Sequence, residues 1–208
     1  MRKSLLTIAA GLALLVGSGA QAQGYVGAAA GWTKVSADCS GTTRCDTTDT
    51  GGKLYGGFKF PNQFAAEAVY FDWGKATAEG SLIPDVEDFS TRKVALNGPS
   101  TLGTLDLRTT GVGVGMAYFM PFATNWTGVV RLGVAQNKGK LTGSLGGDSE
   151  TVSTRSTQPY VGLGIGYNLN SNLTITGEAD FSRVKYGVDG ETQTDRLQLY
   201  TLGVRFAF

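Results

Sequence analysis

Hydrophobic and polar residues alternate along most of the chain after residue 22. From Tyr200 to Phe208, for example, every second residue is a large apolar one, and Thr, Gly, Arg and Ala lie between them. A period of two is typical of β-strands whose two faces meet different surroundings. The pattern recurs in eight segments and predicts strands at 24–35, 49–60, 64–74, 105–119, 126–137, 156–168, 172–184 and 196–208.

The predicted connections alternate in length. Those at 61–63, 120–125 and 169–171 are short, and those at 36–48, 75–104, 138–155 and 185–195 are longer. Eight strands with one apolar face and this loop pattern predict an all-β fold, an eight-stranded antiparallel up-and-down transmembrane β-barrel. Lipid offers no hydrogen bonds, so a sheet that spans it must close on itself. No linker divides 23–208, which we interpret as one barrel domain.

The first 22 residues have the order of a secretory signal peptide. Arg2 and Lys3 precede an apolar run from Leu5 to Val16, and Ala20-Gln21-Ala22 fits the cleavage site. We therefore predict that 1–22 is a cleaved signal peptide and that the mature protein is exported.

Aromatic residues gather near the strand ends, as in the two interfacial belts of membrane proteins. Eight lie beside the short turns or the C-terminus: Phe60, Phe64, Tyr118, Phe119, Phe122, Trp126, Tyr167 and Phe208. Three lie near the longer loops: Trp32, Trp73 and Phe181. We expect these two groups to mark the two membrane surfaces.

Two segments resemble a known family. The stretch from Asp49 to Gly74, which includes Gly51-Gly-Lys53-Leu-Tyr55-Gly56-Gly57, is similar to the opening hairpin of the OmpA-like outer-membrane β-barrel domains. This resemblance implies a place in the cell outer membrane, periplasmic termini and external long loops. We expect no peptidoglycan-binding domain after the last predicted strand, so the resemblance does not imply anchoring to the cell wall.

The C-terminal strand resembles the assembly signal of Gram-negative outer-membrane proteins. That resemblance assigns the signal to alternate residues: Tyr200, Leu202, Val204, Phe206 and Phe208. It also implies the outer-membrane assembly machinery as a partner.

If the apolar face meets lipid, parity places a set of charged residues inside the barrel: Lys53, Lys59, Glu67, Arg131, Glu178, Asp180 and Arg205. Opposite charges in so small a space should pair, because an isolated buried charge is very costly. We therefore predict a filled, salt-bridged lumen. A narrow ion path or a gated switch is the alternative.

Composition excludes several kinds of chemistry. The chain has 18 basic and 17 acidic residues, so nothing favours a nucleic-acid partner. Histidine is absent from the sequence, which removes the commonest general base and metal ligand. Glu178 and Asp180 share a face, but neighbouring arginines should keep both ionised. We expect no catalytic, cofactor or metal site.

The Gly-x-Gly runs at 111–115 and 162–166 lack the lysine and the helix of a phosphate-binding loop, so we interpret them as a small-residue lining. Cys39 and Cys45 lie in the first long loop. Export permits a disulfide, and we predict one between them.

These observations predict a monomeric, non-enzymatic outer-membrane barrel that supports the envelope and presents surface loops, as an adhesin or antigen does. The expected partners are outer-membrane lipid, lipopolysaccharide and a host or surface ligand. The loops that would meet this ligand include 75–104, with Asp85, Glu87, Asp88, Arg92 and Lys93. Alternatives are a small or gated ion-conducting barrel, a barrel enzyme, and a soluble lipocalin-like carrier of an apolar ligand.

Overall fold

The computed structural model describes residues 23–36, 44–82, 101–145, 148–188 and 191–208. These residues form strands almost throughout. The strands are β1 (Gln23–Val35), β2 (Arg44–Asp46), β3 (Thr48–Lys59), β4 (Phe64–Leu82), β5 (Thr101–Ala123), β6 (Trp126–Leu145), β7 (Asp148–Asn168), β8 (Leu173–Val188) and β9 (Glu191–Ala207).

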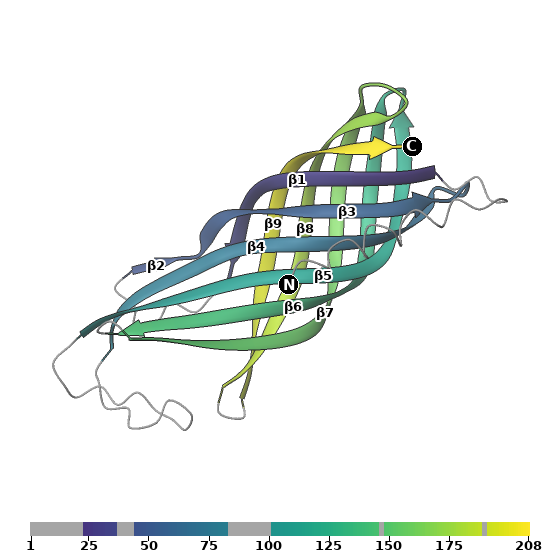
Figure 1. The fold of residues 1–208 in the computed structure, drawn as a ribbon. Coiled ribbons are helices and arrows are strands. Elements are labelled where there is room, and N and C mark those ends of the chain that lie inside the picture. The colour runs from purple at the N-terminus through teal and green to yellow at the C-terminus, as the bar shows by residue number, and fades with distance from the viewer. Residues whose placement is uncertain (1–22, 37–43, 83–100, 146–147, 189–190) are drawn as a thin grey trace, which may run out of the picture.

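The sheet closes into a barrel of eight antiparallel strands, as the sequence predicts (Figure 1). Each of β3 to β9 pairs with its neighbour in the chain, and β1 pairs with both β3 and β9. The short strand β2 pairs with β4 beyond the last β3 pair, where it continues the line of β3. Closure gives each of the eight barrel strands a partner on both sides within the apolar band.

The two ends of the barrel differ. At one end, which we call the short-turn end, residues 60–63, 124–125 and 169–172 connect the strands, and both Gln23 and Ala207 lie there. At the other, which we call the long-strand end, β4 to β7 extend well beyond β1 and β3 (Figure 1).

The predicted loops at 138–155 and 185–195 are largely wrong. Strand β6 runs to Leu145 and β7 starts at Asp148, while β8 runs to Val188 and β9 starts at Glu191. Outside the apolar band the outward face of a strand carries polar side chains. Segments such as Gln136-Asn-Lys-Gly-Lys140 are therefore polar on both faces and lose the hydrophobic alternation that reveals a strand.

Strand β4 also continues past its predicted end at Gly74. A bulge shifts the register between Asp72 and Lys75, and Gly74 has a φ of 73°. A Cβ there would lie 2.8 Å from both Thr33 Oγ1 and the Thr50 carbonyl oxygen, so the position needs glycine. The strand then pairs with β5 as far as Leu82.

The outer and inner faces of the wall are chemically opposite. Large apolar side chains on the outside are exposed on every barrel strand, among them Leu54, Val114, Leu132 and Leu202. The charged residues of the interior lie on the opposite parity; Lys53, Glu67, Arg131, Glu178 and Asp180 are buried, and Lys59 and Arg205 are half-buried. No helix in the described ranges is long and apolar enough to cross a bilayer.

Strands β7 and β8 separate towards the long-strand end. Their pairing stops at Val161 and Phe181, although β7 stays paired to β6 and β8 to β9 far beyond this point. Pro159, two residues further along β7, has no N–H to give to a ladder. We call the stretch where β7 and β8 are not paired the β7–β8 seam.

Candidate functional site

Five charged side chains from four strands meet inside the barrel. Lys53 comes from β3, Glu67 from β4, Arg131 from β6, and Glu178 and Asp180 from β8. All are between 0% and 5% exposed. They are held together because their strands each turn alternate residues towards a lumen that is just wide enough for side chains to fill.

The five groups form a continuous chain of ion pairs, which we call the ion-pair network. Arg131 Nε lies 2.7 Å from Glu67 Oε2, and its Nη1 lies 2.9 Å from Glu178 Oε2. Lys53 Nζ contacts the same Glu178 oxygen. Lys53 Nζ also lies 2.5 Å from Asp180 Oδ2. Three carboxylates are thus linked through two cations across the lumen.

Tyr55 completes the surroundings of the network. Its hydroxyl donates to Glu178 Oε1 at 3.1 Å. The Arg131 guanidinium lies 4.7 Å and the Lys53 ammonium 5.4 Å from the centre of its ring. The ring face therefore adds a cation–π contact to each buried cation.

Glycines make room for these groups. A Cβ at Gly162 would lie 2.5 Å from Asp180 Oδ1, and one at Gly164 would lie 3.0 Å from Glu178 Cγ. A Cβ at Gly133 would overlap the Tyr160 ring. The alternating glycines thus give space to large polar and aromatic partners on other strands.

An aromatic and amide cluster lies on the other side of the network, towards the long-strand end. Phe71 stacks on Trp73 with 4.6 Å between ring centres, and it meets Tyr160 edge to face at 5.4 Å. Trp73 Nε1 donates to Asn137 Oδ1 at 3.3 Å. The prediction that Trp73 and Phe119 belong to the interfacial aromatic belts is therefore wrong. Trp73 shares the parity of Glu67 and is fully buried in the lumen, and Phe119 is 2% exposed and also faces inward.

Side chains bridge the β7–β8 seam where the backbone pairing ends. Ser182 Oγ donates to the Pro159 carbonyl at 3.1 Å, and Asn137 Nδ2 donates to the Arg183 carbonyl at 2.8 Å. These bonds satisfy two backbone acceptors beside the seam. Alternation does not reveal such roles, because neither Ser182 nor Asn137 differs in pattern from other inward polar residues.

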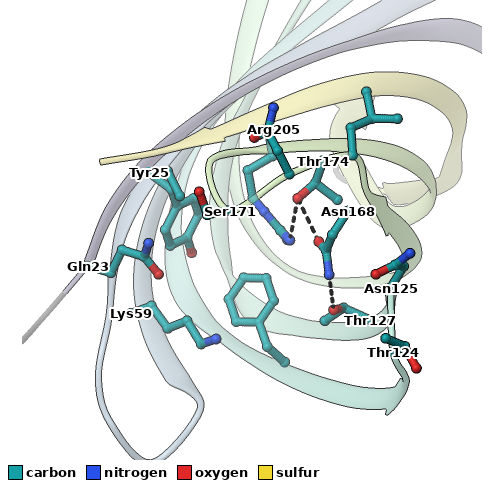
Figure 2. Close-up of a pocket in the computed structure, with 14 residues that line it drawn as sticks. Gln23, Tyr25, Lys59, Thr124, Asn125, Thr127, Asn168, Ser171, Thr174 and Arg205 are labelled. Atoms are coloured by element: carbon teal, nitrogen blue, oxygen red, sulfur yellow. Dashed lines mark hydrogen bonds between the residues drawn. The ribbon is translucent and has the colours of Figure 1, made fainter.

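The remaining two predicted lumen cations lie apart from the network, at the short-turn end. Lys59 and Arg205 line an open pocket of about 480 Å³, with Tyr25, Phe119 and a set of Asn, Thr and Ser side chains (Figure 2). Arg205 Nη2 donates to Thr174 Oγ1 at 3.3 Å, and Thr174 donates to Asn168 Oδ1 at 2.9 Å. The structure therefore divides the predicted cluster into two groups.

The other predicted site residues are placed as follows. Tyr200, Leu202, Val204, Phe206 and Phe208 are all exposed on the outer face of the wall, and Phe208 N donates to the Gly24 carbonyl at 2.8 Å. Cys45 lies on β2, whereas Cys39 lies outside the described residues, so their disulfide stays a prediction. Residues 1–22 and Asp85, Glu87, Asp88, Arg92 and Lys93 also lie outside them.

The middle of the lumen is filled by side chains. Each of the three network carboxylates is engaged by a cation, and the aromatic and amide cluster packs beside them. In the described part of the chain, no group of three His, Cys, Asp or Glu side chains is placed to hold a metal ion.

Several solved structures of low sequence identity share this fold. The crystal structure of neisserial surface protein A matches with a TM-score of 0.57 and 16% identity, over 89% of this chain and 97% of that one. Ail, the attachment invasion locus protein of Yersinia pestis, crystallised with the heparin analogue sucrose octasulfate, matches with a TM-score of 0.51 and 16% identity, over 90% and 99%.

A major outer membrane protein of Thermus thermophilus gives a TM-score of 0.51 at 15% identity, over 90% of this chain and 100% of that one. Comparison with curated protein sequences finds no match. The family model described as the outer membrane protein beta-barrel domain matches residues 4–208. With the closed barrel and its apolar outer face, this match locates the protein in the outer membrane and shows that the chain belongs to the outer membrane protein β-barrel domain family.

Proposed function

We propose that the protein is a monomeric, non-enzymatic outer-membrane barrel that supports the envelope and presents its long-strand end at the cell surface, as an adhesin or antigen does. The observation that carries this proposal is the ion-pair network. It fills the lumen with five buried charged side chains, so solute passage is opposed and function moves to the ends of the barrel.

The outer face of the long-strand end has the chemistry of an anion-binding surface. Beyond the apolar band, outward-facing cations occur on seven of the eight barrel strands: Lys34, Lys75, Arg108, Lys138, Arg155, Arg183 and Arg196. We call this set the basic collar. In the register, Lys75 faces Arg108, Lys138 faces Arg155, and Arg183 faces Arg196.

Like charges directly opposite on neighbouring strands repel, unless anions lie between them. Among the described residues, one ion pair is seen in the collar, between Arg108 Nη2 and Asp72 Oδ2 at 3.1 Å. Phosphate groups at the outer membrane surface would offset the remaining repulsion. We therefore assign lipopolysaccharide as the lipid partner of the collar. The polyanion on Ail, a barrel of the same fold, supports a similar ligand for this surface.

The outward row from Tyr200 to Phe208 is accessible along one face of β9, which suits recognition by the outer-membrane assembly machinery. Deletion of Phe208 should lower the amount of protein inserted in cells. Normal insertion of the shortened chain would contradict this role.

Surface presentation is tested with epitope tags in intact cells. A tag between Leu145 and Asp148 should bind antibody on intact cells, because it lies at the long-strand end. A matched tag at 124–125, at the short-turn end, should bind only after the outer membrane is permeabilised. The reverse pattern of labelling would overturn the proposal.

A further inference from the structure

We propose that the pocket at the short-turn end of the lumen binds an oxyanion, a phosphate or carboxylate group, with Lys59 and Arg205 as its charged ligands. This site is separate from the basic collar, which lies at the opposite end and on the outer face. It does not depend on the surface role proposed above.

The two cations are not neutralised by the protein. Of the described residues that line the pocket, none is acidic. Within the described part of the chain, neither Lys59 nor Arg205 makes an ion pair, and the three carboxylates nearest along the lumen are engaged by Lys53 and Arg131. The pocket therefore carries two positive charges with no negative partner of its own.

Phe119 fixes where these charges lie. The Lys59 ammonium is 5.4 Å and the Arg205 guanidinium 4.7 Å from the centre of its ring, which is itself 2% exposed. Tyr25 packs edge to face on Phe119 with 5.6 Å between ring centres. Both cations are thus held against one rigid aromatic wall, and their mutual repulsion favours an anion that contacts both.

Neutral polar groups orient the site further. Figure 2 shows a chain of hydrogen bonds from Arg205 through Thr174 to Asn168, and Asn168 Nδ2 donates to Thr127 Oγ1 at 3.3 Å. Because Thr174 accepts from Arg205 and donates to Asn168, the guanidinium is held at one nitrogen and its other donors are available. A guanidinium suits oxyanions, which it can bind through two N–H groups at once.

The size and position of the pocket limit the kinds of ligand that it can bind. Its volume of about 480 Å³ lies in the range of small-molecule sites. The pocket is lined mainly by inward-facing side chains and turn residues, so it opens to water at the barrel mouth. A small water-soluble phosphate or carboxylate compound fits this opening. A lipid headgroup that reaches over the rim would supply the same chemistry.

The test uses the full mature protein folded in dodecyl maltoside, a detergent without phosphate, titrated calorimetrically with inorganic phosphate. We expect saturable binding that is at least about tenfold weaker in K59Q/R205Q, because each lost cation removes a charge-assisted hydrogen bond. The conservative K59R/R205K variant should retain binding. The matched control R44Q/K140Q, which removes two exposed cations that belong neither to the pocket nor to the basic collar, should bind like the wild type.

Heat-modifiable gel migration checks that each variant is folded. Absence of saturable binding by the folded wild type, or equal binding by folded K59Q/R205Q, would overturn the proposal. Titration in nanodiscs distinguishes a soluble ligand from a lipid headgroup as the source of the oxyanion. Phosphate binding that is unchanged between phosphatidylcholine and phosphatidylglycerol discs supports a soluble ligand, whereas competition by phosphatidylglycerol supports a lipid headgroup on the same residues.

Discussion

Single residues in the lumen act mainly through charge balance. Taking a carboxylate or a guanidinium out of water costs several kcal/mol, which a well-placed partner offsets. Arg131 depends on two carboxylates, Glu67 and Glu178, whereas Lys53 retains Asp180 if Glu178 is neutralised. Neutralising Glu67 and Glu178 should therefore destabilise the network through Arg131 more than through Lys53.

The double variant E67Q/E178Q should lower the free energy of unfolding by about 3–5 kcal/mol, because it leaves the Arg131 guanidinium buried without a counter-ion. Urea unfolding followed by tryptophan fluorescence measures the change. The control D72N breaks the exposed pair with Arg108 and should cost less than about 1 kcal/mol. A loss in E67Q/E178Q no larger than that of D72N would show that the network contributes little.

Gly133→Ala should destabilise the barrel by about 1–3 kcal/mol, because the new methyl group overlaps the Tyr160 ring. Tyr160 has little room to retreat, since Phe71 packs against it. Gly177→Ala is the matched control: its Cβ would lie 3.6 Å from Leu202 Cδ2, an ordinary contact. The new Cβ of Gly133→Ala would also lie 2.5 Å from the Val114 carbonyl oxygen. The same urea assay compares the two variants, and equal free energies of unfolding would mean that both the Tyr160 ring and the neighbouring β5 backbone adjust at little cost.

Parity alone predicts much of the interior. It correctly places Lys53, Glu67 and Arg131 inside, because one apolar face must meet lipid. The same parity points Trp73 inward, but its aromatic character suggested an interfacial belt. The separation of Lys59 and Arg205 from the network was not predictable, because parity gives the face of a residue and not its depth along the lumen.

Among the elements, the strands within the apolar band were predicted closely and their extensions were not. Hydrophobic alternation marks the part of a strand whose outward face meets lipid, and it ends where outward residues become polar. Beyond it, strands such as β6 and β7 are held by pairing with each other, which a single sequence does not display. The β7–β8 seam was hidden for the same reason, although Pro159 is a local sign that a ladder ends.

Asn137→Leu should loosen the β7–β8 seam. The change leaves the Trp73 N–H and the Arg183 carbonyl without their partner, so local opening should become easier by about 1–3 kcal/mol. Hydrogen exchange should quicken in the β7 and β8 segments that flank the seam and stay slow in the apolar band. The control T142A removes a side-chain bond to Thr151, where the β6–β7 ladder is continuous, and should change exchange little. Quickened exchange throughout the barrel would argue against a local role.

For the whole molecule, the filled lumen predicts that the protein is not an open channel. Purified wild-type protein in planar bilayers should show no steady conductance, because the network and the aromatic cluster occupy the interior of an eight-stranded barrel. The variant K53A/E67A/R131A/E178A removes most of the network but leaves Phe71, Trp73 and Tyr160 in the lumen, so we expect conductance only when these three side chains are truncated as well. Stable ohmic conductance in the wild type would instead favour the ion-conducting alternative.

Closure of the barrel joins the two ends of the chain. Tyr25 on β1 pairs with Ala207 on β9, so the pairing that closes the barrel joins residues about 180 positions apart. Every other pairing in the barrel wall joins consecutive barrel strands. By loop-closure arithmetic, bringing the two ends of so long a segment together costs about 5 kcal/mol of chain entropy. Before β9 pairs with β1, the edge strands at both sides of the sheet expose unpaired N–H and C=O groups. An incomplete sheet is therefore unstable in lipid, where these groups find no hydrogen-bond partner. We therefore expect insertion to finish only after the whole chain has been synthesised and exported. A chain shortened by one strand would form an open sheet with two unpaired edges that are prone to aggregation.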